Sequence, residues 1–187
     1  MTTITTQNGT ELTLRAVSEF YITSVRNKAQ ADFEKEHGTL FTPPTYDIQC
    51  GGGPFGEWTE TRTHTTETIE QGTDAEKDAW QRYITQQREL SNLTWMRTAR
   101  VYLLRGVTTE PPDNGWVERQ KRDGLEIPTD AEGLKQHWIE TEAVLNPHEL
   151  GMIVVTIQAQ SQQVKAARQL AADTFRRAME LAGRDDA

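Results

Sequence analysis

Residues 73–106 read TDAEKDAWQRYITQQRELSNLTWMRTARVYLLRG, and this stretch decides the fold class of the chain. Thr73 and Glu76 have the spacing of a capping box, which satisfies free backbone N–H groups at a helix start. Apolar residues recur at the spacing of an amphipathic helix, at Ala79, Trp80, Tyr83, Ile84, Leu90, Leu93, Met96, Val101 and Leu104. Gly106 suits a helix C-terminus. We therefore predict one long helix over residues 73–106, with a polar middle, QQRELSN, that suits a bend or passage through solvent.

The chain after this helix indicates more helices joined by short turns. Residues 115–125, GWVERQKRDGL, predict a short helix ending at Gly124. Thr129 and Glu132 have the spacing of a second capping box, which predicts another helix directly after them.

Asn146, Pro147 and Glu149 are favoured at the N-cap, first and third positions of a helix. They predict a helix carrying LGMIVVTIQAQS, followed by a separate last helix, QQVKAARQLAADTFRRAMELAG, over residues 162–183. No heptad pattern is sustained long enough to predict a coiled coil.

Two hairpins are expected before the long helix. Asn8-Gly9 tolerates the positive φ angles of a type I′ turn and predicts the first, between short Thr-rich strands. The runs YDIQC and EWTETRTHT alternate like strands and predict the second. A helix over residues 19–36 lies between them. The predicted fold is mainly α, a helical bundle with small N-terminal β-hairpin elements (α+β).

We expect two domains, which differ in composition. Residues 1–72 hold the first hairpin, a helix and a Gly/Thr-rich arm, and residues 73–187 form a helical domain.

The arm contains GGGPFG at residues 51–56, which has the spacing of a dinucleotide-binding G-x-G-x-x-G loop. Such a loop precedes a helix whose N-terminus faces the phosphate, whereas EWTETRTHT here is typical of a strand. Pro54 removes a backbone donor, and Glu57 would repel a phosphate. We interpret the stretch as a hairpin loop and expect no cofactor.

No residue set in the sequence specifies catalysis or metal binding. The acidic residues Asp47 and Glu57 near Cys50 work against the lowered pKa that a catalytic thiol needs. The HExxH zinc motif fails at PHELGM because Met152 stands where the second His is needed. We predict that the chain is not an enzyme and that it has no catalytic or metal-binding residues. A hydrolase with an acidic site is the less favoured alternative, because carboxylates are plentiful.

Composition restricts the partners. The net charge of −8 disfavours nucleic acid, because binding to it depends on Lys and Arg. No apolar run approaches the roughly 20 residues that span a membrane, and the start of the chain lacks the features of a signal peptide. Hydrophobic residues make up 35% of the chain and the mean hydropathy is −0.70, so we expect some surfaces to be buried on a partner.

Phe55 and Trp58 are aromatic residues in an otherwise polar hairpin. Trp and Tyr are enriched at the centres of protein interfaces, so these residues indicate a docking surface; folding back onto the body is the alternative. A second candidate contact is the helix face with Ile153, Val154 and Ile157.

The order of segments resembles small proteins from the tail-gene modules of long-tailed bacteriophages, often called tail assembly chaperones. The resemblance spans most of the chain and depends on TLRAVSEFYI, TPPTYDI, TDAEKDAWQRYITQQ, YLLRGV and GLEIPTDAEGLKQHWIETEAVLNPHEL followed by a helical C-terminus. The Gly-rich hairpin departs from the family's pattern.

This resemblance implies a non-catalytic protein that binds the tape-measure protein or other tail subunits, such as the tube, during tail assembly. It implies a location in the host cytoplasm, with association with the virion left open, and the family offers no catalytic residues to transfer. A structural component of the virion tail is the alternative, and a homo-oligomer is compatible with either role.

Overall fold

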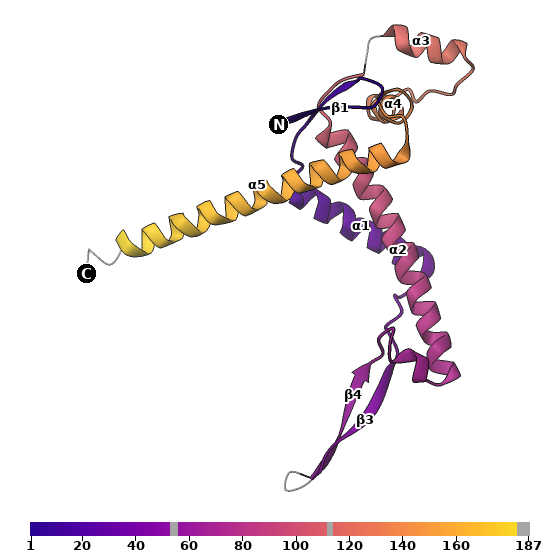
Figure 1. Cartoon of the computed structure of the whole chain (residues 1–187), viewed down its shortest axis with the longest axis vertical. Helices are drawn as coiled ribbons and strands as arrows, with labels where there is room; N and C mark the ends of the chain where they lie inside the picture. The colour runs from indigo at the N-terminus through magenta and orange to yellow at the C-terminus, as the bar shows by residue number, and fades with distance from the viewer. Residues whose placement is uncertain (53–55, 112–113, 183–187) are drawn as a thin grey trace. The chain divides into compact units, whose positions relative to one another are not determined.

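The computed structural model describes residues 1–52, 56–111 and 114–182, and the chain is mainly helical, at 62% (Figure 1). It divides into two compact units. The first contains Met1–Arg26 and Met96–Ala187, and the second contains Asn27–Trp95. The helices α1 (Glu19–His37) and α2 (Asp74–Gly106) contribute residues to both units. In the described part of the chain, no helix has the length and apolar character needed to span a membrane.

The division into units differs from the predicted boundary at residue 72. The first hairpin belongs with the later helices because β2 (Glu11–Leu14) buries Leu12 and Leu14 in their core. The chain after α2 also pairs with this strand, since Thr108 N donates to Thr13 O at 2.8 Å. The sequence could not show this pairing, which joins residues 95 positions apart.

The first hairpin is confirmed, but its turn is not of type I′. The strand β1 (Thr2–Thr5) pairs with β2 so that Thr5 lies opposite Glu11. Gly9 has a φ of 86°, whereas no described residue other than glycine has a positive φ. Because Gly9 N donates to Thr6 O at 2.9 Å, the connection is a three-residue loop that ends in a left-handed glycine.

The first unit is completed by α3 (Asn114–Arg122), α4 (Ala131–Trp138), the π-helical turn η2 (Ile139–Ala143) and α5 (Pro147–Ala182). Its core contains the buried side chains Leu12, Leu14, Val17, Ile22, Tyr102, Leu103, Val107, Trp116, Trp138, Ile139, Ala143, Val144, Ile153, Val154 and Ile157. Phe20, which helical spacing assigns to the buried stripe of α1, is instead 85% exposed.

The N-cap of α5 agrees with the prediction, whereas the N-cap of α4 differs from it by one residue. Asn146 caps α5, because its Oδ1 accepts from Glu149 N at 2.9 Å. At α4 the cap is Asp130 rather than Thr129, since Asp130 Oδ1 accepts from Gly133 N at 2.7 Å. An Asp directly after the Thr competes for the same free N–H groups and is at least as good a cap.

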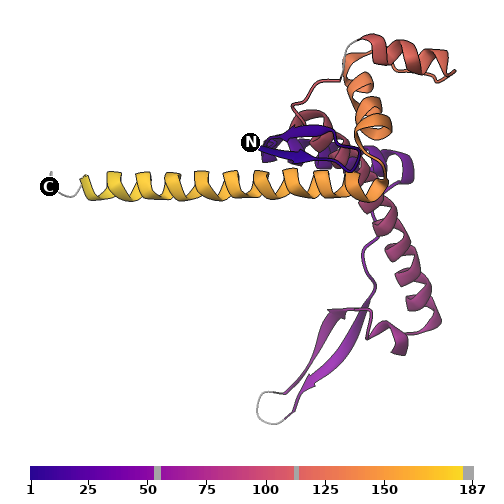
Figure 2. The same cartoon turned by 45° about the horizontal axis from the view of Figure 1, so that its top comes forward.

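The C-terminal residues form one helix where two were expected. The helix α5 continues through Ser161, Gln162 and Gln163 without a break (Figure 2). Polar residues at this point do not stop a helix, because none of them removes a backbone donor or requires a positive φ. The side chain of Ser161 is accommodated within the helix by donating to Ile157 O at 2.7 Å.

The second unit contains the predicted arm, formed by β3 (Thr45–Gly51) and β4 (Glu57–Thr63), and the short 3₁₀ turn η1 (Ile69–Gln71). The strands are antiparallel, with Thr45 opposite Thr63 and Gly51 opposite Glu57. GGGPFG therefore connects two strands of a hairpin, although Gly53, Pro54 and Phe55 lie outside the described residues. The capping box at the start of α2 is confirmed: Glu76 N donates to Thr73 Oγ1 at 3.3 Å, and Thr73 N donates to Glu76 Oε2 at 2.7 Å.

Candidate protein-interaction surface

The β3–β4 arm has two faces of different chemistry. Directly opposite residues of an antiparallel pair lie on the same face, and successive residues alternate between faces. One face, here called the apolar face, carries the pairs Tyr46–Arg62, Ile48–Glu60 and Cys50–Trp58. The opposite, polar face carries the pairs Thr45–Thr63, Asp47–Thr61 and Gln49–Thr59.

Side chains on the polar face bond to one another across the strands. Thr61 Oγ1 donates to Asp47 Oδ1 at 2.6 Å, and Gln49 Nε2 donates to Thr59 Oγ1 at 3.1 Å. Cross-strand pairs of this kind are the main local stabilisation of a two-stranded ribbon. The polar face therefore has the chemistry of a surface that remains in water.

The apolar face retains substantial exposure. Trp58 is 54% exposed, and Tyr46, Ile48 and Cys50 are half-buried. All residues of β4 are exposed, and among the described residues these two strands pair only with each other (Figure 1). An isolated two-stranded hairpin is at best marginally stable in water. This face is thus the part of the arm that would gain most from a covering layer.

Charged residues at the centre of the apolar face neutralise each other. Arg62 holds both carboxylate oxygens of Glu60, with Nη2–Oε2 at 3.0 Å and Nε–Oε1 at 3.1 Å. Cys50 Sγ lies 3.5 Å from Glu60 Oε2. Partial desolvation, together with the Glu60 carboxylate, raises the pKa of the Cys50 thiol. A thiol with a raised pKa is a poor nucleophile, so the position of Cys50 favours packing over catalysis.

Trp58 is fixed near the end of the arm by Gly51. The φ of Gly51 is 96°, and a Cβ at this position would lie 2.5 Å from Cζ3 of Trp58 and 2.4 Å from Gly56 O. The indole therefore lies against the Gly51 backbone, in space that any side chain would occupy. Glycine has a low cost for this φ, so it supplies both the turn and the space for the ring.

The base of the arm depends on His64, the first residue after β4. His64 N donates to Pro44 O at 2.9 Å, which continues the strand pairing by one more bond. Its ring is buried and lies 4.5 Å, centroid to centroid, from the ring of Tyr46 on the apolar face. Aromatic contacts at this separation are favourable. Tyr46 thereby joins the apolar face to the interior of the second unit.

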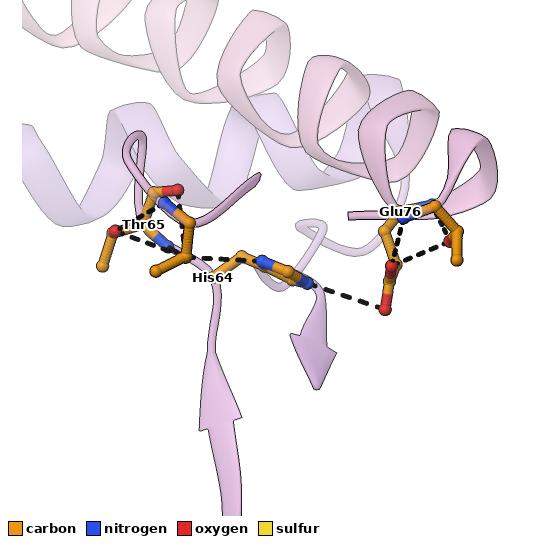
Figure 3. Close-up of polar contacts among 5 residues, drawn as sticks. His64, Thr65 and Glu76 are labelled. Atoms are coloured by element: carbon orange, nitrogen blue, oxygen red, sulfur yellow. Dashed lines mark hydrogen bonds and ion pairs between the residues drawn. The ribbon is translucent and has the colours of Figure 1, made fainter. Parts of the chain in front are cut away.

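His64 also connects the arm to the start of α2 (Figure 3). Its Nδ1 lies 3.4 Å from Thr68 Oγ1, and its Nε2 lies 3.6 Å from Glu76 Oε1, within ion-pair distance when the ring is protonated. Glu76 is itself held by Thr73, whose Oγ1 donates to Oε2 at 2.8 Å. The capping box of α2 thus also orients the carboxylate that faces the base of the arm.

The environment of Glu76 favours its charged form. The Thr73 backbone N–H, then the Thr73 hydroxyl, and with smaller effect the His64 ring, hold the pKa of this carboxyl below its usual range. Hydrogen bonds donated to a carboxylate stabilise the ionised state. Glu76 therefore stays charged in mildly acidic solution.

The structure separates the sequence-predicted contact residues into three groups. Trp58 is exposed on the apolar face, as a docking residue requires. Phe55 lies outside the described residues. The prediction for Ile153, Val154 and Ile157 is wrong for the folded chain, because their side chains are at most 1% exposed in the chain's own core. Their helical face is apolar because it packs internally against the hairpin and α2.

Tyr46 and Ile48 also belong to the candidate surface, although they were not among the residues predicted from the sequence to contact a partner. The signal was present, because the alternation in YDIQC places them with Cys50 on one side of a strand. Assigning Trp58 to the same side required the register, which depends on how many residues form the loop.

No group of three or more His, Cys, Asp or Glu side chains among the described residues is placed to hold a metal ion. Comparisons with known protein families, with curated proteins and with solved structures found no match to this chain.

Proposed function

We propose that this chain is a non-catalytic assembly protein whose β3–β4 arm binds another protein through its apolar face. The observation that carries the proposal is the exposure of Trp58 beside the half-buried Tyr46 and Ile48, on a ribbon whose strands pair, among the described residues, with each other alone. Exposed aromatic residues on one face are typical of interface centres. Covering them would stabilise a hairpin that is marginal by itself.

The resemblance supplies the class of partner. It implies subunits of a long-tailed bacteriophage tail, either the tape-measure protein or the tube protein, in the host cytoplasm before or during polymerisation. The alternative is a structural component of the tail itself. The outer edges of β3 and β4, which no described strand pairs with, favour this alternative, because an exposed strand edge can pair with a strand of a neighbouring subunit.

Binding to tail-tube and tape-measure proteins of long-tailed bacteriophages tests the proposal, with affinity measured by calorimetry on purified proteins. Trp58→Ala should weaken binding by about tenfold or more, since truncation of a central Trp costs well over 1 kcal/mol. Thr63→Ala is the matched control, because it changes the same strand on the polar face and should preserve affinity. The proposal fails if neither protein binds, or if both variants bind as the parent does.

Analysis of purified virions distinguishes the two roles. A chaperone should be absent from finished particles, and a structural subunit should be present in a fixed ratio to the tube protein. Mass spectrometry of particles provides this measurement.

A further inference from the structure

A groove in the first unit lies between the start of α1 and the part of α5 beyond the core. Its volume is about 530 Å³, and it is lined by Ala16–Phe20 on one side and by α5 residues from Ser161 to Ala172 on the other. Volumes of this size are typical of sites that accept a ligand or several side chains of a partner.

The floor of this groove is pre-formed. Ser161 Oγ accepts a hydrogen bond from Val17 N at 2.9 Å and donates to Ile157 O at 2.7 Å. Both Ser161 and Val17 are buried. A buried hydrogen bond between residues 144 positions apart fixes the segment before α1 against α5. Binding in the groove therefore requires little ordering of the backbone, which lowers the entropic cost of association.

The walls combine exposed apolar groups with two cations. Phe20 is 85% exposed and Val164 is 40% exposed, while Lys165 and Arg168 line the same space. Among the described residues, no carboxylate lies within ion-pair distance of either cation. The groove's carboxylate, Glu19, is already 3.5 Å from Arg26.

The helix surface beside the groove continues a buried stripe. Leu150, Ile153 and Ile157 pack in the core, and the same helical spacing leads to Val164 and Ala171, which are exposed. In both views, α5 runs on beyond the other elements of its unit (Figures 1 and 2). The apolar seam of α5 is thus covered by its own chain up to Ser161 and exposed at Val164 and Ala171.

The basic residues of α5 beside the groove indicate which kind of partner would bind there. Residues 162–177 contain four basic residues and one acidic residue, Asp173, in a chain of net charge −8. Asp173 lies 3.8 Å from Arg176. Two copies of α5 packed together would place these cations against one another, which is unfavourable. A partner with carboxylates beside apolar residues would complement them.

We infer that this groove binds an acidic amphipathic helix of a partner protein. The apolar side of such a helix covers Phe20 and Val164, and its carboxylates pair with Lys165 and Arg168. A helix that docks in an apolar groove contacts it through residues spaced three and four positions apart along the helix. The site is separate from the β3–β4 arm, so the inference does not depend on the proposed role of the arm.

A pair of designed peptides tests this on the full chain. Each is a fluorescein-labelled helix of about 18 residues with Leu at helical spacing, and its remaining positions are Glu in one peptide and Lys in the other. Fluorescence anisotropy should show binding of the Glu peptide, weakened at higher salt because surface charges are screened, and no binding of the Lys peptide. Equal binding of the two peptides would overturn the inference.

Variants locate the peptide on the chain. The double substitution Lys165→Glu with Arg168→Glu should weaken binding of the Glu peptide by about tenfold or more and create binding of the Lys peptide. Phe20→Ala should also weaken binding of the Glu peptide. Arg88→Glu, an exposed charge reversal elsewhere on the chain, is the matched control and should leave affinity unchanged. Unchanged binding by the double variant would assign the peptide to another surface.

Two further measurements separate the outcomes. Trp58→Ala should leave peptide binding unchanged, so failure of the arm proposal and failure of this inference are distinguishable. Analytical ultracentrifugation of the unliganded chain tests whether a second copy of the chain binds in the groove instead. A dimer that Phe20→Ala dissociates would assign the groove to a second copy and overturn the inference of an acidic partner.

Discussion

The indole of Trp58 lies against the backbone of Gly51, so closely that a Cβ at Gly51 would lie 2.5 Å from Cζ3 of the ring. Gly51→Ala should therefore displace Trp58 and add strain of roughly 1–2 kcal/mol at a positive φ. The indole Nε1–H resonance of Trp58, assigned by its loss in Trp58→Phe, should shift clearly in an NMR spectrum.

Gly52→Ala is the matched control for this effect. Gly52 also has a positive φ, 130°, but a Cβ there meets nothing within 4 Å. Gly52→Ala should therefore strain the backbone while leaving the Trp58 indole resonance near its original position. Equal shifts in the two variants would show that the ring does not depend on the space above Gly51.

Gly106 has a similar spatial role in the core of the first unit. A Cβ at Gly106 would lie 2.6 Å from Cγ2 of Ile157, so Gly106→Ala forces two packed helices apart. The expected loss is about 1–3 kcal/mol in the free energy of unfolding. Gly151→Ala, at a helical position with no neighbour within 4 Å, should instead stabilise the chain by about 0.5–1 kcal/mol. Urea denaturation of both variants checks that the free energy of unfolding falls in Gly106→Ala and rises in Gly151→Ala.

Ser161 supplies the hydrogen-bond acceptor for a buried backbone group of the β2–α1 segment. Ser161→Ala would leave Val17 N without its partner at a buried position, with an expected cost of about 1–3 kcal/mol. Thr174→Ala is the control, because its hydroxyl also donates to a helix carbonyl, Leu170 O, but on an exposed surface. Thermal unfolding should separate the two, and a Ser161→Ala protein as stable as the parent would contradict the role of this bond.

Glu76 should titrate below the usual carboxyl range, because Thr73 and His64 lower its pKa. A carboxylate with a lowered folded-state pKa stabilises the fold above the unfolded-state value, and that contribution is lost as the pH falls through the folded-state value. The Thr73 amide resonance should report this titration in NMR spectra recorded in acid. Thr73→Ala should move the midpoint upward, and Glu76→Gln should abolish it. A parent midpoint at the ordinary Glu value would contradict the lowering.

The arm shows how far sequence reasoning reaches at the candidate site. Period-two alternation in YDIQC and EWTETRTHT was sufficient to predict both strands, and the exposure of Trp58 agrees with the docking interpretation. The prediction of a partner contact at Ile153, Val154 and Ile157 was wrong, because an apolar helical stripe looks identical whether it faces a partner or its own core. Burial of these residues depends on Leu12, Leu14 and Gly106, which meet them through contacts distant in sequence.

Residue type and spacing along the chain were sufficient to predict the local structure: the long α2 with its Thr73–Glu76 cap, the two hairpins and the start of α5 at Pro147. These features depend on interactions within a few residues, so residue type and spacing specify them. Which apolar faces are covered depends on how the folded chain packs. This packing placed the first hairpin on the helical core and joined His64 to Glu76 at the base of the arm. It also left Phe20, Trp58 and Val164 exposed, because burial depends on neighbours that the chain brings together only when it folds.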